Sequence, residues 1–324
     1  MATKPTKRIL DWASGGTKTD PGAAKEAAGW LTSDRPPAQW WNWVLSSFGD
    51  WLTYFDQFTP LKVIKNLAQY RYSGVSYNRT GDGSGSFPLR GISFTDGGNR
   101  MYWGNSTALY DYTLSTPYDI STLSYVKVAA TYATTPTLAY DVVFSDNQTT
   151  FFVLGSSGVY EWELDAAGGT GTFVDSFTTS TQDSAARGLT FSKNGEHFYL
   201  VGQTNNTIYQ YDCPTAWDLT GCSYSTNSFL ATGQDTSPLA IQIYNSGTSL
   251  IIGGSTNDTF YEYELTTAYD ISTAVYTGNS VNYSGTDNSI YKFTVTEEGS
   301  HLIWAGAENF LIYQSYINSV VSDR

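Results

Sequence analysis

Residues 109–126 read Leu-Tyr-Asp-Tyr-Thr-Leu-Ser-Thr-Pro-Tyr-Asp-Ile-Ser-Thr-Leu-Ser-Tyr-Val, and versions of this stretch return along the chain. Successive copies are separated by 49 to 52 residues. A repeat of roughly 40–50 residues built from short strands is typical of a β-propeller. The five copies therefore predict a mainly β protein with five blades. Their aromatic pairs are Tyr110/Tyr112, Tyr160/Trp162, Tyr209/Tyr211, Tyr261/Tyr263 and, in degraded form, Tyr313 with Ser315.

Each repeat has room for four strands. In the first repeat, residues 91–94, 100–104 and 109–114 are expected to form three strands, and residues 121–126 the fourth. The turn Asp96-Gly97-Gly98-Asn99 consists of residues that tolerate positive φ, as a tight hairpin between twisted strands requires. We therefore expect four-stranded blades.

The connection between the third and fourth strands has a recurring order of small residue, aromatic, Asp, aliphatic, then Ser or Thr. An Asp suits a structured turn because its side chain accepts backbone N–H bonds, and the aromatic ring can cover the blade edge. Exposed rings on these turns would alternatively be platforms on which sugars stack. The aromatic positions are Tyr118, Trp217 and Tyr269.

The fifth repeat ends after its third strand, because only seven residues follow Ile317. An open blade edge leaves unpaired N–H and C=O groups, which invite aggregation. The segment 70–78, which precedes the first repeat, is similar to the fourth-strand segment 121–126. We therefore expect residues 70–78 to close the last blade, in a propeller that comprises residues 66–324.

Composition and charge narrow the class of protein. Aromatic residues make up 16% of the chain and charged residues 15%, which suits a tightly turned β protein. There is no run of about 18 apolar residues and no signal-like start, so we expect neither a membrane span nor secretory export. Residues 66–324 hold nine Lys and Arg against twenty-four Asp and Glu, a net charge of −15 that would repel phosphate backbones. We therefore expect no nucleic-acid partner.

The first 65 residues differ in kind from the repeats. They contain six of the ten Trp residues. Pro36-Pro37 occupies a first-turn position, where a missing N–H costs nothing, and predicts a helix over residues 38–58. Large aromatic residues recur in this helix at spacings of three and four, so they share one face.

This aromatic face is the basis for an expected anchor module over residues 1–65. A segment of this size buries only about 60% of its surface when it folds alone. We therefore interpret the face as an interface, with copies of itself or with a scaffold protein. The alternative is that the helix packs on the underside of the propeller. The residues assigned to the interface are Trp30, Pro36, Pro37, Trp40, Trp43 and Trp51.

A resemblance to a known family is carried by the same segment, in Trp12-Ala13-Ser14-Gly15-Gly16, Asp20-Pro21-Gly22, Pro36-Pro37-Ala38-Gln39-Trp40 and Asn42-Trp43. This order resembles the N-terminal attachment segment of bacteriophage tail fibres and related virion appendages. The repeats are likewise similar to propeller repeats in phage tail-associated proteins. The resemblance implies that residues 1–65 dock onto the particle while the propeller projects from it.

Further expectations follow from that resemblance. It implies other virion proteins as partners, and a location in the tail or another appendage after assembly in the host cytoplasm. Tail fibres usually continue into long β-helical or coiled-coil shafts, and this chain has none. A compact appendage or connector is therefore favoured over a long-reaching fibre.

The sequence offers little catalytic chemistry. His197 and His301 occupy the same repeat position at the start of a second strand, which is a structural explanation for both. No motif for a hydrolase nucleophile, a zinc protease, a phosphate-binding loop or a multi-Cys metal site is present. We therefore expect no cofactor and no metal.

Five-bladed propellers can be glycoside hydrolases, which need two carboxylates about 5–10 Å apart at the channel mouth. Asp141 is the only acid at the head of an inner strand. The corresponding residues of the other blades are Gly91, Gly188, Ala240 and Lys292. Because one acid is not a pair, we expect no enzyme activity and no effect when Asp141 is replaced by Asn.

Cys213 and Cys222 bracket the third-to-fourth-strand turn of the third repeat. Paired positions across a hairpin bring thiols within bonding range, and a disulfide that closes about ten residues would contribute roughly 2–3 kcal/mol. A virion assembles in reducing cytoplasm, where thiols persist. A disulfide and free thiols are therefore equal alternatives.

Three functions are compatible with these features. The first is a bacteriophage virion structural protein that is anchored and oligomerised through residues 1–65. The second is a carbohydrate-binding propeller that contacts a host-surface glycan or protein, with Tyr118, Trp217 and Tyr269 as its aromatic platforms. The third is a glycan-cleaving enzyme. We favour the first, which is compatible with the second.

Overall fold

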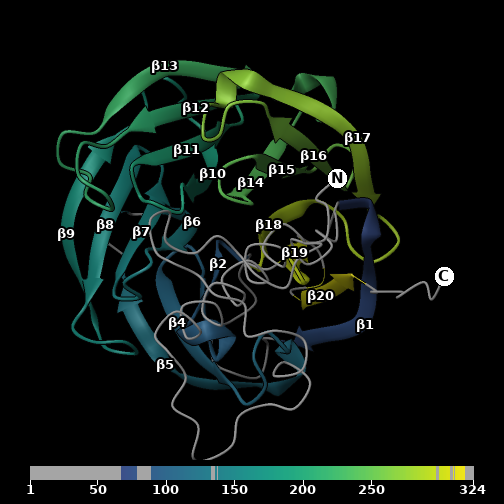
Figure 1. Cartoon of the computed structure of the whole chain (residues 1–324). Helices are drawn as coiled ribbons and strands as arrows, with labels where there is room; N and C mark the ends of the chain where they lie inside the picture. The colour runs from purple at the N-terminus through teal and green to yellow at the C-terminus, as the bar shows by residue number, and fades with distance from the viewer. Residues whose placement is uncertain are drawn as a thin grey trace, which may run out of the picture. The chain divides into compact units, whose positions relative to one another are not determined.

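The computed structural model describes residues 67–78, 89–132, 136, 138–296, 299–306, 309 and 311–317. Within these residues, twenty β-strands form five four-stranded sheets. The sheets follow one another around a ring, each with one edge toward its centre (Figure 1). The prediction of a five-bladed β-propeller with four strands in each blade is confirmed.

The blades are numbered by chain order. Blade 1 consists of β2 (Ile92–Thr95), β3 (Arg100–Gly104), β4 (Ala108–Leu114) and β5 (Leu123–Thr131). Blade 2 consists of β6 (Ala139–Phe144), β7 (Thr150–Gly155), β8 (Gly158–Leu164) and β9 (Gly171–Thr178). Blade 3 consists of β10 (Ala186–Phe191), β11 (His197–Gly202), β12 (Thr207–Asp212) and β13 (Ser223–Leu230). Blade 4 consists of β14 (Pro238–Tyr244), β15 (Ser249–Gly254), β16 (Thr259–Leu265) and β17 (Ala274–Asn282).

Blade 5 consists of β18 (Ile290–Val295), β19 (His301–Gly306), β20 (Leu311–Ile317) and β1 (Tyr70–Asn78). Short 3-10 helices lie in the connections: η1 (Leu67–Gln69), η3 (Asp96–Gly98), η4 (Ile120–Thr122), η5 (Ala231–Gly233) and η6 (Ile271–Thr273). Neighbouring strands within each blade pair antiparallel, as short hairpin connections require.

The second aromatic residue of the repeat fills the core. Tyr112, Tyr211 and Tyr263 are 0–1% exposed. The rings of Phe198 and Tyr211 stack with their centroids 4.5 Å apart. Buried clusters extend from one blade to the next; Ile303 of blade 5, for example, belongs to the cluster that surrounds Met101 and Trp103 of blade 1. Each blade is therefore held by apolar contacts with its neighbours.

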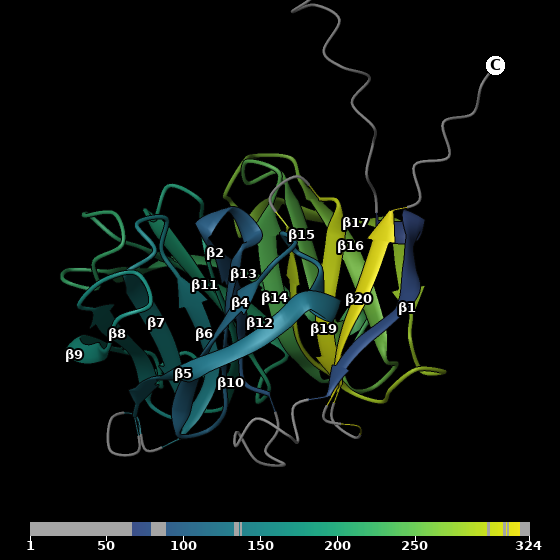
Figure 2. The ribbon, with the colours of Figure 1, turned by 90° about the horizontal axis from the view of Figure 1, so that it is seen from below.

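The ring is closed by β1, as the sequence predicts. β1 pairs antiparallel with β20, from Tyr70 opposite Ile317 to Asn78 opposite Leu311. Figure 2 shows the two strands side by side although they come from opposite ends of the described chain. The pairing covers the edge of β20 that would otherwise be open to another chain.

A repeated hydrogen bond shows that the closing segment begins before β1. A Glu or Gln in the third strand of one blade accepts the backbone N–H of a buried aliphatic residue in the turn before the fourth strand of the next. Leu67 is that residue for blade 5, and its side chain is 0% exposed. The four donor–acceptor pairs, with N···O distances of 2.9 to 3.2 Å, are Ile120 with Gln314, Leu219 with Glu161, Ile271 with Gln210 and Leu67 with Glu262.

The expected anchor module lies outside the described residues. Its assigned residues Trp30, Pro36, Pro37, Trp40, Trp43 and Trp51 therefore stay sequence predictions, as do its helices and its boundary at residue 65. In the part of the chain that the structure describes, there is no helix with the length and apolar character to cross a membrane.

Candidate functional site

The first strands of the five blades, β2, β6, β10, β14 and β18, surround the propeller axis. Each contacts the first strand of the next blade, and β18 contacts β2. Hydrogen bonds between inner strands join positions that are equivalent or one residue apart in the repeat. The five strands therefore begin at one end of the axis and finish at the other. We call these the upstream end and the downstream end.

Asp141 and Lys292 meet near the axis. The Lys292 Nζ lies 2.7 Å from the Asp141 Oδ2, and the two side chains are 4% and 8% exposed. Nζ also donates to the carbonyl oxygens of Arg187 and Leu239. Three acceptors use all three N–H bonds of an ammonium group, which indicates that the pair is ionised.

The Asp141 carboxylate is fully engaged. Besides Lys292, it accepts the backbone N–H groups of Val142 and Leu189, each at 2.9 Å. Burial raises the pKa of the Asp141 carboxyl and lowers that of the Lys292 ammonium, while each partner's charge acts in the opposite sense. The group thus ties together blades 2, 3, 4 and 5.

This arrangement corrects one expectation from the sequence. Asp141 does lie on an inner strand level with Lys292, as the repeat alignment predicts. Its charge balances a buried ammonium group, so we now expect its replacement by Asn to destabilise the propeller rather than to be silent.

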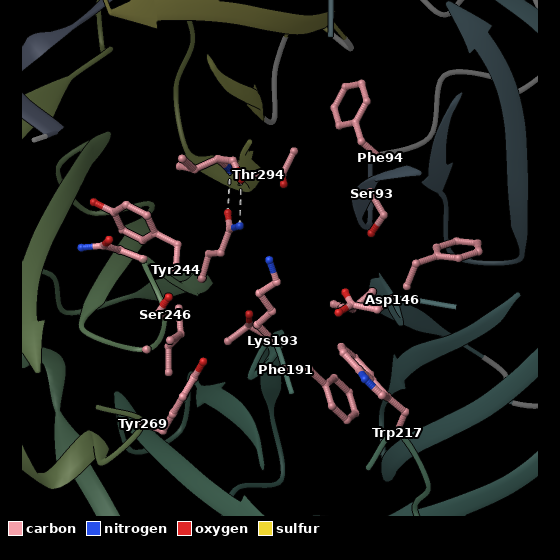
Figure 3. A pocket seen from close by; sticks show the side chains of 18 residues that line it. Ser93, Phe94, Asp146, Phe191, Lys193, Trp217, Tyr244, Ser246, Tyr269 and Thr294 are labelled. Atoms are coloured by element: carbon pink, nitrogen blue, oxygen red, sulfur yellow. Dashed lines mark hydrogen bonds between the residues drawn. The ribbon is translucent and has the colours of Figure 1, made fainter. Parts of the chain in front are cut away.

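A cavity of about 430 Å³ opens at the downstream end (Figure 3). It is lined by residues from the ends of all five inner strands and from the turns that follow them. The Lys193 side chain reaches toward its middle in Figure 3. The labelled lining residues are Ser93, Phe94, Asp146, Phe191, Lys193, Trp217, Tyr244, Ser246, Tyr269 and Thr294.

Gln242 shapes the wall of this cavity. Its side-chain amide donates to the Val295 carbonyl oxygen at 3.0 Å and accepts the Val295 N–H at 2.6 Å, so it bridges blades 4 and 5. Lys193 and Asp146 are exposed, whereas Thr190 beneath them is buried. The described lining of the cavity therefore combines an exposed cation, an exposed carboxylate, hydroxyl groups and aromatic rings.

The three turn aromatics have a structural role that the sequence only partly anticipates. Tyr118, Trp217 and Tyr269 adopt φ of 59°, 59° and 65° and are half-buried. Each lies on the glycine of the first hairpin in its own blade: a methyl group at Gly98 or Gly195 would come within 2.6 or 2.4 Å of the ring above it.

The same rings also contact the preceding blade. Trp217 packs near Phe152, with centroids 6.2 Å apart, and Tyr269 stacks at 6.0 Å on His197. Of the three, Trp217 and Tyr269 line the cavity and Tyr118 does not. The structure therefore brings two of the three expected platforms to one site, with part of each ring engaged in blade packing.

The histidines and the turn acids occupy the structural positions that the repeat indicates. His197 Nδ1 lies 2.8 Å from Asp212, and His301 Nδ1 lies 2.9 Å from the Ser300 hydroxyl. Asp119 accepts the Ser121 N–H at 3.0 Å, which caps η4. None of these groups lines the downstream cavity.

Cys213 and Cys222 form a disulfide, with their sulfur atoms 2.02 Å apart. It closes the turn that carries Trp217. Of the two alternatives left open by the sequence, the structure contains the disulfide.

Sequence reasoning missed Lys193 and Gln242 as lining residues. Lys193 belongs to the hairpin turn Lys193-Asn194-Gly195, and its repeat counterparts Asp146 and Asn245 line the same cavity. Aligning these turns around a ring would have brought the three together. Among the described residues, no group of three His, Cys, Asp or Glu is placed to hold a metal ion.

Comparison with known proteins does not identify a family for this chain. No protein-family model and no curated protein matches the chain. One similar solved structure is that of a functionally unknown protein from Desulfotomaculum acetoxidans, at 12% sequence identity and a TM-score of 0.44. The alignment covers 68% of this chain and 63% of that one. A likeness at this level carries no conclusion about function.

Proposed function

We propose that the protein is a bacteriophage virion protein, attached to the particle through residues 1–65, whose propeller contacts a host-surface glycan without cleaving it. The virion assignment is supported by the resemblance of residues 1–65 and of the repeats to phage tail-associated proteins. The glycan assignment is carried by one observation, the polar and aromatic cavity at the downstream end.

The chemistry of the cavity suits a sugar. Glycans are bound by rings that cover their apolar faces and by a few polar groups that fix their hydroxyls. Trp217 and Tyr269 supply ring surface, and Lys193, Asp146 and Thr190 supply donors and acceptors. Among the described residues of the lining, Asp146 is the only carboxylate, and Asp141 below it is committed to Lys292. These two acids therefore do not form the pair of available carboxylates that hydrolysis uses.

The first test of this proposal is Lys193→Ala combined with Asp146→Ala in the full chain. Hydrogen bonds to charged groups contribute about 1.5–3 kcal/mol, so binding of a host-surface glycan should weaken at least about tenfold. The measurement is a screen of the intact protein against host polysaccharide fragments, followed by calorimetric titration. The matched control is Lys127→Ala, which removes a Lys from the outer strand of blade 1. Absence of any captured glycan, or equal affinity of both variants, would count against the cavity.

The second test concerns the anchor. If Trp43 lies in an interface with another virion chain, Trp43→Ala should lower affinity by more than about 2 kcal/mol, roughly thirtyfold, because large aromatic residues commonly dominate such interfaces. Incorporation into particles should fall while the propeller melts as before. If instead the segment packs on the propeller, the melting temperature of the propeller should fall and incorporation into particles should persist. Sedimentation of particles and calorimetry of the purified variant distinguish the two results.

A further inference from the structure

The upstream end of the axis carries a group of four side chains with no assigned role. Arg90, Tyr140, Arg187 and Tyr291 occupy equivalent positions, one residue before Gly91, Asp141, Gly188 and Lys292. Leu239 holds this position in blade 4. All four of the Arg and Tyr side chains are half-buried. We refer to them as the Arg–Tyr cluster.

The cluster alternates cation and ring around the axis. The Arg187 guanidinium carbon lies 4.1 Å from the Tyr140 ring centroid, and the Arg90 guanidinium carbon lies 5.4 Å from both the Tyr140 and the Tyr291 centroids. The rings fix the planes of both guanidinium groups, because cations of this kind stack on aromatic faces. Two preorganised cations thus share one tyrosine.

The guanidinium donors are largely unused. Within the described chain, the only hydrogen bond from either side chain runs from Arg187 Nη1 to the Ala186 carbonyl oxygen at 3.1 Å. The Nε of Arg90 is buried and has no partner there. By contrast, Arg100 holds Asp111 through two bonds, of 2.7 and 2.8 Å. A buried donor without an acceptor costs free energy unless a ligand or water satisfies it.

The local charge is also unbalanced. Lys292 and Asp141, at the next position along the axis, neutralise each other. Among the described residues, the two arginines therefore leave a charge of +2, in a chain whose net charge is −13. Burial lowers the pKa of the Arg90 guanidinium, and the charge of Arg187 acts in the same direction. An anion bound between them would relieve both effects.

We propose that the Arg–Tyr cluster binds an oxyanion group, a carboxylate or a phosphate, between Arg90 and Arg187 at the upstream end of the axis. Guanidinium groups match the two-oxygen edge of either anion through parallel N–H···O bonds. Two kinds of ligand carry such an oxyanion group: an acidic sugar and free phosphate. The site lies at the other end of the axis from the glycan cavity and does not rest on the proposed function.

The experiment titrates the full-length protein with sodium phosphate and, separately, with glucuronate, at constant ionic strength and with glucose as the neutral analogue of glucuronate. We expect saturable binding of at least one anion and none of glucose. Binding of glucuronate alone would identify a carboxylate-bearing sugar as the ligand. Binding of both glucuronate and phosphate would identify a general oxyanion site. No saturable binding of either anion up to about 10 mM would overturn the proposal whatever the variants do.

The variants locate the binding. Arg187→Gln and Arg90→Gln should each weaken it about tenfold or more, as expected for loss of a charge-assisted bond. Arg71→Gln, which removes an exposed arginine from β1, is the matched control and should bind like the unaltered protein. Lys193→Ala should also leave anion binding intact, because it alters the downstream end. Binding that survives both Arg90→Gln and Arg187→Gln would place the anion elsewhere and refute the site.

Discussion

Deletion of residues 67–78 is expected to make the chain aggregate. The deletion removes the fourth strand of blade 5 and the buried side chains of Leu67 and Tyr70, which are 0% and 2% exposed. Burial of those two side chains is worth roughly 3–6 kcal/mol, and each lost ladder bond adds about 0.5–1.5 kcal/mol. The total is comparable to the whole stability of a domain, about 5–15 kcal/mol. Light scattering and calorimetry on the purified protein measure the outcome.

Two further experiments distinguish the effect of lost stability from the effect of an exposed strand edge. Leu67→Ala in the full chain should cost about 2–5 kcal/mol yet cause no aggregation, because β20 remains paired. A synthetic peptide of residues 65–78, added during refolding of the deletion variant, should restore solubility by pairing with β20. A deletion variant that does not aggregate and melts like the full chain would show that β1 does not close the ring.

Asp141→Asn is expected to be among the most destabilising single substitutions in the propeller. It leaves the Lys292 ammonium buried without its counter-charge, and loss of one partner of a buried pair costs about 3–5 kcal/mol. For a domain of this size the melting temperature should fall by roughly 6–20 °C. Differential scanning calorimetry of the purified variant provides the measurement.

Asp146→Asn is the matched control, because it removes the same charge from an exposed position on the same blade. Its effect should stay within about 0.5 kcal/mol. The double variant Asp141→Asn with Lys292→Met should regain much of the loss, since replacement of both charges removes the uncompensated ammonium. Equal melting temperatures for Asp141→Asn and Asp146→Asn would mean that the ion pair contributes nothing.

The repeat placed Asp141 and Lys292 at equivalent positions, yet sequence reasoning did not pair them. Their separation of 151 residues is three blades. Depending on the width of the ring, a side chain at this position could face a partner from another blade or face solvent. The spacing along the chain does not distinguish these two arrangements. The ring brings the long Lys292 side chain across to blade 2, where its Nζ lies 2.7 Å from the Asp141 Oδ2.

The turn aromatics also show which features can be predicted from the sequence and which cannot. Trp217 and Tyr269 lie between a Gly-containing hairpin of their own blade and the preceding blade. This position follows from local turn chemistry. It agrees with the sequence prediction that the rings cover the blade edge. Their convergence with Lys193 on one cavity does not follow locally, because the lining residues belong to five blades. Which side chains reach the axis depends on how far each blade tilts and how the ring closes.

The sequence by itself determined the number of blades, their four strands and the segment that closes the ring. These features depend on period, alternation and turn chemistry, which act between residues close together in the chain or repeated at a fixed interval. Only the tertiary structure decided what the axis holds: the Asp141–Lys292 pair, the downstream cavity and the Arg–Tyr cluster. The physical reason is that closure of five sheets brings residues 48 and even 151 positions apart within hydrogen-bonding distance, and their charges and donors then determine one another's environment.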